Sequence, residues 1–240
     1  MITKDEIPQI LFSNMKIVEP YPDGVSPISE MLETTAFFPG GKGLWLEDIS
    51  LIYPEILVLG HDFATENSFN SIRARKKADL DCPTWKNIID LFSEVGINPS
   101  NCFFSNVFMG LRKSNPMIGK FPGAKDRGFY NRNLEFLKFQ IKTIRPKTII
   151  TLGSYAPKML SKISDELKVW GENKSFLYFD KLNASLIKNA YIDDMKFNCI
   201  RLLHPSLRKV NLKYRIYKGY LGNEAEVMML KEVVEPINFV

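Results

Sequence analysis

Short apolar runs, each stopped by a glycine or a polar residue, recur along the chain. A continuous apolar run of this length is typical of a strand buried on both faces of a parallel sheet. Between the runs, apolar residues recur at helical spacing, most clearly over 85–95 and 129–144. Strands that alternate with helices indicate βαβ units with right-handed crossovers, and therefore an α/β fold. The predicted strands are 56–59, 103–107, 148–152 and 199–203.

The remaining segments carry weaker patterns. Residues 1–50 contain many prolines and glycines and predict a loop-rich extension with one short helix over 7–18. Residues 66–81 are polar and predict an exposed loop or a short helix. A small hairpin is predicted from 175–179 and 184–187, and a last helix from Tyr214 or Glu224 to Val234. Because neither a repeat nor a linker interrupts the pattern, we expect residues 1–240 to form a single domain.

Composition narrows the class of protein without identifying it. The 240 residues carry a formal net charge of +5, which is compatible with a polyanionic partner. The three cysteines form no CxxC motif, which favours reduced thiols in a cytoplasmic protein. The N-terminus shows no basic and apolar leader, and no apolar run is long enough to span a bilayer. We therefore expect no signal peptide and no membrane partner.

Polar side chains follow three of the four predicted strands. Asp62 comes just after the first strand, Asn106 lies at the end of the second, and His204 follows the fourth. In open α/β sheets, ligands bind beyond the carboxyl ends of the strands, so these residues are candidates for one site. The alternative is structural, because Asp62 is equally suited to cap a helix and a lone histidine at a strand end is often part of the packing.

Four short motifs in the same order resemble the uracil-DNA glycosylase superfamily. Gly60-His61-Asp62-Phe63 resembles the water-activating motif, which is Gly-Gln-Asp-Pro-Tyr in the best-known branch. Phe104-Ser105-Asn106 resembles the strand whose final Asn reads the uracil edge. Residues 145–153 resemble the Pro-Lys-strand-Leu-Gly segment, and 204–207 resemble the His-Pro-Ser loop. The resemblance covers about residues 55–215 and implies a three-layer αβα fold with a four-stranded parallel sheet.

The resemblance also implies a role for each matching residue. Asp62 would stabilise the sugar cation and orient or deprotonate water, and His204 would donate a hydrogen bond to the departing base. Asn106 offers both a donor and an acceptor to a pyrimidine edge. Leu207 would fill the space left by the flipped base, although its position is equally suited to a core residue. The other expected contacts are Gly60, His61, Phe63 and Phe69 with the base, and Ser206, Arg208 and Lys209 with DNA.

Three departures from the family pattern bear on substrate and cofactor. Phe63 and Ala64 stand where the best-known branch has Pro and Tyr, and that Tyr excludes the methyl group of thymine. Ala64 therefore predicts tolerance of a C5 substituent, unless Phe63 or Phe69 fills the gap. Phe69 is the candidate aromatic floor, but it lies closer to Asp62 than the usual pattern requires. The iron–sulfur branches need four cysteines, so we expect no cluster, no metal and no other cofactor here.

A basic segment follows the fourth strand. Residues 196–223 contain no acidic residue, and three tyrosines are interleaved with the basic positions. This is the composition that a phosphate-binding surface requires. The alternative is a solvated helix face with its tyrosines turned toward the core. The basic residues are Lys196, Arg201, Arg208, Lys209, Lys213, Arg215 and Lys218.

These observations favour a DNA glycosylase that flips uracil or another altered pyrimidine out of the stack and hydrolyses its N-glycosidic bond. We expect it to act as a monomer on duplex or single-stranded DNA. One alternative is a catalytically silent nucleic-acid-binding protein with the same fold. A dinucleotide-binding enzyme is a weaker alternative, because neither glycine turn reads G-x-G-x-x-G.

Overall fold

A five-stranded mixed sheet forms the centre of the computed structural model, which describes residues 6–32, 37, 55–75, 82–113 and 119–234. The strand order is β3-β2-β5-β7-β6, and the first four strands run parallel. Only β6, at one edge, is antiparallel to its neighbour. The bounds are β2 (Ile56–Gly60), β3 (Cys102–Asn106), β5 (Thr148–Leu152), β6 (Leu186–Ile192) and β7 (Met195–Leu202).

The α/β prediction and the four parallel strands are confirmed, but the predicted number of strands was wrong. Strand β6 pairs with β7 as a hairpin, whereas the segment predicted to be its partner is helix α6 (Phe176–Lys181). The apolar pattern of β6 is broken because Lys188 and Asn189 are exposed and the register shifts between Ile187 and Ala190. An edge strand of this kind lacks the continuous apolar run that marks a buried parallel strand.

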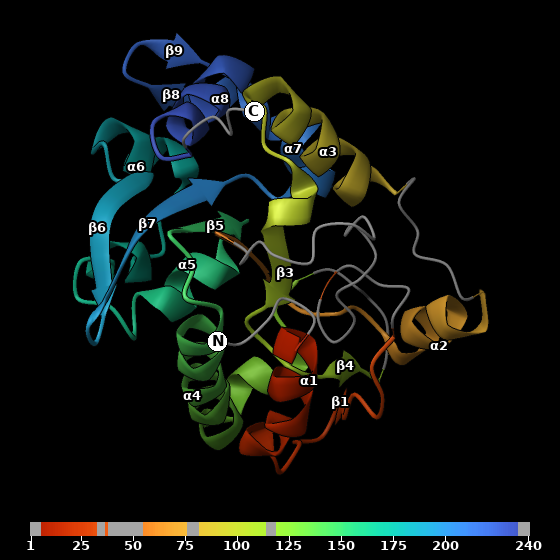
Figure 1. Ribbon diagram of the computed structural model, residues 1–240. Helices are drawn as coiled ribbons and strands as arrows, with labels where there is room; N and C mark the ends of the chain where they lie inside the picture. The colour runs from red at the N-terminus through yellow and green to blue at the C-terminus, as the bar shows by residue number, and fades with distance from the viewer. Residues whose placement is uncertain (1–5, 33–36, 38–54, 76–81, 114–118, 235–240) are drawn as a thin grey trace.

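Helices cover both faces of the sheet (Figure 1). On one face, α1 (Glu6–Ser13), α4 (Arg127–Ile144) and α5 (Tyr155–Leu160) share a hydrophobic core with Leu57 and Ile149 of the strands. On the other face, α3 (Pro83–Val95) and α8 (Asn223–Lys231) pack against Val58 and Ile200. Successive strand residues point to opposite faces, so every parallel strand contributes to both cores, which explains why these strands are mainly apolar.

Local sequence signals explain several of the helix ends. Helix α3 ends at Gly96, whose φ of 81° favours glycine. The side chain of Asp126 accepts a hydrogen bond from the Phe129 N–H and begins α4. The last helix begins at Asn223, near the later of the two predicted starts, and the predicted helix over 7–18 is divided into α1 and a 3₁₀ turn. None of the helices in the described ranges is long and apolar enough to cross a membrane.

Short elements complete the described chain. They are the helices α2 (Glu66–Arg75) and α7 (Arg208–Asn211), the short strands β1 (Val25–Ser26), β4 (Leu111–Arg112), β8 (Ile216–Tyr217) and β9 (Tyr220–Leu221), and the 3₁₀ turns η1 (Met15–Val18), η2 (Pro99–Asn101), η3 (Pro122–Lys125), η4 (Lys168–Gly171), η5 (Pro205–Leu207) and η6 (Leu212–Tyr214).

Candidate active site

A cavity of about 880 Å³ lies at the carboxyl ends of the parallel strands. The segments that follow β2, β5 and β7 line it, together with the last residue of β3. The structure therefore brings Asp62, Asn106 and His204 to one cavity, at the end of the sheet where ligands of α/β proteins bind. The lining also includes Gly60, His61, Phe63, Ala64, Gly153, Tyr155, Ser206, Leu207 and Tyr214.

The carboxylate of Asp62 accepts hydrogen bonds from four donors. Its Oδ1 accepts from the Ala64 N–H at 3.0 Å and from Nε of Arg112 at 3.1 Å. Its Oδ2 lies 2.8 Å from Nη2 of Arg112 and 3.0 Å from Nδ1 of His61. An ionised carboxylate has about four acceptor positions. All of them face a donor here, so the orientation of Asp62 is fixed by its neighbours.

These partners also determine the protonation of Asp62. Burial alone would raise the pKa of this carboxyl, but hydrogen bonds from His61 and Arg112 outweigh burial and lower the pKa to about 2. Arg112 is itself held in place, because its guanidinium donates to the Gly119 carbonyl at 2.9 Å and its side chain is only 4% exposed. Asp62 is therefore a permanent anion at neutral pH, paired with a permanent cation.

His61 is enclosed by aromatic rings. Its imidazole stacks on Tyr155 with 3.9 Å between ring centroids and 10° between planes, and Phe108 meets it edge-on at 5.7 Å. Because Nδ1 points at Asp62, the proton of the neutral ring belongs on that nitrogen. In the described part of the chain, Nε2 is buried and has no hydrogen-bond partner. The stack on Tyr155 fixes the ring plane and so fixes the direction of the bond to Asp62.

Asn106 approaches the backbone of the neighbouring strand. Gly60 and Asn106 are paired directly in the parallel register of β2 and β3. A Cβ atom on Gly60 would lie only 2.4 Å from Oδ1 of Asn106. A side chain at position 60 would therefore displace the Asn106 amide from its place at the cavity.

His204 has a defined tautomer. Its Nδ1 lies 3.3 Å from the Ser206 backbone N–H, which can only donate, and 2.8 Å from Oγ of Ser206. Nδ1 is thus the acceptor and the neutral ring carries its proton on Nε2. Burial lowers the pKa of His204 and the nearby His61 lowers it further, against a smaller opposing effect of Asp62. The site therefore offers a neutral imidazole with an Nε2–H donor.

The structure places Phe69 elsewhere than predicted. Its side chain is 5% exposed, belongs to the hydrophobic core beneath α2, and is not among the residues that line the cavity. The expectation that Phe69 forms the aromatic floor is therefore not favoured, because sequence spacing does not show toward which side a helical residue points. Phe63, by contrast, lines the cavity, and Leu207 is 55% exposed at its mouth, which excludes the core position considered for it.

Four of the seven basic residues in the segment are buried or paired with a carboxylate. Arg201 and Arg215 are buried, Lys218 is paired with Glu232, and Nε of Arg208 lies 2.9 Å from Oε2 of the fully buried Glu226. The guanidinium of Arg208, which we predicted to contact DNA, is thus already paired with Glu226. Of the interleaved tyrosines, Tyr217 is buried, whereas Tyr214 is 51% exposed. The exposed basic residues beside Leu207 are Lys209 and Lys213.

Two residues of the site lie outside the motifs that the sequence shows. Arg112 comes from the short strand β4 and lies 50 positions from Asp62. Tyr155 lies in the first turn of α5, two positions after Gly153. In the described ranges, no group of three or more His, Cys, Asp or Glu side chains is arranged to hold a metal ion.

Comparison with known proteins agrees with the geometry. The family model described as the uracil DNA glycosylase superfamily matches residues 51–218, a range that contains Asp62, Asn106 and His204. A comparison with curated proteins finds no match.

Proposed function

The chain belongs to the uracil DNA glycosylase superfamily, and from this premise we propose that it hydrolyses the N-glycosidic bond of uracil or another altered pyrimidine in DNA. Members of the superfamily are generally DNA glycosylases. The observation that carries the proposal is the convergence of Asp62, Asn106 and His204 on one cavity at the carboxyl ends of the parallel strands. Such a cavity accepts a base only after it leaves the stack, which costs a few kcal/mol.

Each of the three side chains meets one requirement of the reaction. Cleavage builds positive charge on the sugar, as in other glycoside hydrolyses, and negative charge on the departing base. Asp62 supplies a fixed negative charge for the sugar, and the Nε2–H of His204 donates to a base oxygen. The amide of Asn106 offers a donor and an acceptor to the pyrimidine edge. Since the acceptor positions of Asp62 are occupied, its negative charge contributes more to catalysis than its capacity to accept a proton from water.

The main alternative is a nucleic-acid-binding protein without activity. Incubation of the purified protein with labelled oligonucleotides that carry a panel of altered bases, followed by detection of abasic sites, separates the two functions. We expect abasic sites with uracil and no cleavage product with unmodified DNA. Binding to every oligonucleotide without any abasic product would favour the silent protein.

Lys209→Ala is expected to weaken DNA binding and to reduce its salt dependence, because each lost phosphate contact lowers the slope of log K against log salt by about one. Arg208→Ala is the matched control, one position away in α7. Its guanidinium is tied to Glu226, so we expect the slope to be unchanged. The measurement is fluorescence anisotropy over a salt series. A slope reduced by Arg208→Ala and not by Lys209→Ala would contradict this assignment.

The cavity wall at Ala64 predicts a broad substrate range. A methyl group stands where the best-known branch has a phenol, so we expect release of both uracil and C5-substituted pyrimidines. Ala64→Tyr should narrow this range, because exclusion of a methyl group needs a steric wall and a hydrophobic pocket alone discriminates by only about 1–3 kcal/mol. Initial rates on matched oligonucleotides give the comparison.

The backbone at this position supplies a control for the Ala64 experiment. Ala64 has a φ of 81°, which disfavours a bulky residue, so thermal unfolding of Ala64→Tyr must be measured alongside its rates. Ala64→Gly fits the same φ and should keep the broad range. A wild-type protein that releases uracil but rejects every C5-substituted base would contradict the prediction.

A further inference from the structure

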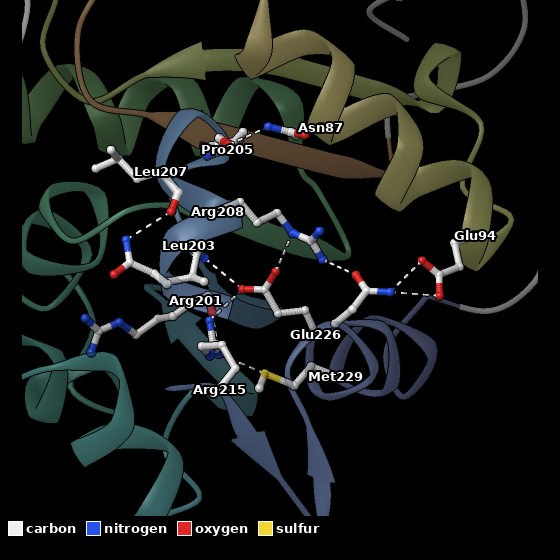
Figure 2. A network of polar contacts seen from close by, with 12 residues as sticks. Asn87, Glu94, Arg201, Leu203, Pro205, Leu207, Arg208, Arg215, Glu226 and Met229 are labelled. Carbon is white, nitrogen blue, oxygen red and sulfur yellow. Dashed lines mark hydrogen bonds and ion pairs between the residues drawn. The ribbon is translucent and has the colours of Figure 1, made fainter. Parts of the chain in front are cut away.

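The loop that carries His204 is held by one buried carboxylate at both of its ends (Figure 2). Glu226 of α8 is fully buried. Its Oε1 accepts from the Leu203 N–H at 2.9 Å, immediately before His204. Its Oε2 accepts from Nε of Arg208 at 2.9 Å, immediately after Leu207. A single side chain thus fixes the entry and the exit of residues 204–207.

Further hydrogen bonds hold the loop between these two points. Nδ2 of Asn87, in α3, donates to the Pro205 carbonyl at 2.8 Å, and Nδ2 of Asn211 donates to the Leu207 carbonyl at 3.0 Å. Within the loop, the Leu207 N–H donates to the His204 carbonyl at 2.9 Å. The backbone on both sides of the imidazole therefore has little freedom, and this fixes the direction of the His204 Nε2–H.

The ion pairs around Glu226 involve no residue that lines the cavity. Arg215 lies between two buried carboxylates, with Nη1 2.7 Å from Oε1 of Glu226 and Nε 2.9 Å from Oδ2 of Asp180. Arg208 is the second arginine that pairs with Glu226, and its Nη2 also donates to Asn223, which in turn bonds to Glu94 of α3. Figure 2 shows this chain of contacts running from α3 through α8 to the loop.

Buried ion pairs of this kind are weak evidence for stability, since well-packed apolar residues often replace them without loss. They do fix geometry, because each carboxylate accepts only from donors in definite directions. We propose that Glu226 is a positioning residue for His204, which acts by fixing both ends of the 203–208 loop. The inference rests on the proposed function for its effect on catalysis, but the orientation of His204 can be observed without any substrate.

Asp180 provides a matched control for Glu226. Both carboxylates are fully buried and both pair with Arg215, so Glu226→Gln and Asp180→Asn remove the same charge from the same network. Asp180 accepts from Oγ of Ser185 and from the Ile216 N–H, and these bonds lie outside the 203–208 loop. A general loss of stability should affect both variants, whereas a loss of loop geometry should affect only Glu226→Gln.

Nitrogen-15 NMR of the imidazoles gives a direct readout, because the chain has only two histidines. In the wild type and in Asp180→Asn we expect His204 to keep an Nδ1 acceptor and a protonated Nε2. In Glu226→Gln we expect averaging of the two tautomers, with kcat reduced by about 100-fold and KM little changed. The proposal would be overturned if the imidazole signals of His204 in Glu226→Gln still showed the single wild-type tautomer. An equal loss of kcat in both variants would also overturn it.

Asn87→Ala tests the same inference if Glu226→Gln does not fold. It removes the bond to the Pro205 carbonyl at a partly buried position and leaves the charged network intact. We expect a smaller change of the same kind in the His204 signals and in kcat. An unaltered His204 spectrum in this variant would contradict the role of these anchors. If no variant and no wild-type preparation releases a base, the proposed function fails, while the NMR result still decides the positioning of His204.

Discussion

Asp62→Asn is expected to slow base release by at least about 100-fold while DNA affinity stays nearly unchanged. The substitution removes the negative charge that faces the sugar, whereas the exposed lysines beside Leu207 remain in place. Single-turnover rates of abasic-site formation measure the first effect, and anisotropy titration measures the second. A variant that keeps the wild-type rate would show that the carboxylate has no part in the reaction.

The same substitution also leaves Arg112 without its counter-ion. Removal of one member of a buried pair typically costs about 3–5 kcal/mol of stability, so the activity lost through unfolding must be separated from the activity lost with the charge. The double variant Asp62→Asn, Arg112→Gln removes the pair as a unit and should recover thermal stability without recovering activity. If the double variant regains the wild-type rate, the defect of the single variant comes from breaking the ion pair and not from loss of the carboxylate.

Gly60→Ala is expected to abolish base recognition, although the change is one methyl group. Its Cβ would lie 2.4 Å from Oδ1 of Asn106, so the amide must leave its place in the cavity. The backbone at Gly60 is ordinary extended strand, so alanine introduces no strain of its own. When a site built to hydrogen-bond its substrate has its polar groups left unpaired, kcat/KM falls by about 10⁴–10⁵-fold. This factor is the upper limit for the loss of kcat/KM in Gly60→Ala. The measurement is kcat/KM on a uracil oligonucleotide.

A double-mutant cycle shows whether Gly60→Ala acts through Asn106. Asn106→Ala removes the amide and leaves room for the added methyl group. If the clash is the cause, Gly60→Ala combined with Asn106→Ala should be no worse than Asn106→Ala alone. Additive losses from the two changes would contradict this explanation and would indicate an independent role for Gly60.

The location of the site could be predicted from the sequence because apolar strands end at definite residues. The runs before Asp62 and His204 and the run that ends at Asn106 are mainly apolar, and parallel strands place their carboxyl ends at one edge of the sheet. Arg112 and Tyr155 could not be predicted in the same way. They reach the cavity from a two-residue strand and a short helix, whose position depends on tertiary packing.

Charge in the sequence was a poor guide to charge on the surface. Residues 196–223 contain no acidic residue, yet Glu226, just beyond the segment, pairs with Arg208 and Arg215, and Asp180, from α6, pairs with Arg215. A local count of basic residues does not include such partners. Phe69 illustrates the same limit for apolar residues, because the sequence alone does not show whether an aromatic ring faces a cavity or the core beneath its helix.

The four hydrogen bonds to Asp62 have a consequence for the energetics of bond cleavage. In water, a carboxylate and its solvent shell must rearrange as positive charge appears on a sugar, and this reorganisation adds to the barrier. Here Ala64, His61 and Arg112 hold the carboxylate in a single orientation before any substrate arrives. Its field therefore needs no rearrangement at the moment of reaction. The adjacent Arg112 cancels this field at longer range, so only a sugar bound close to Asp62 benefits from it.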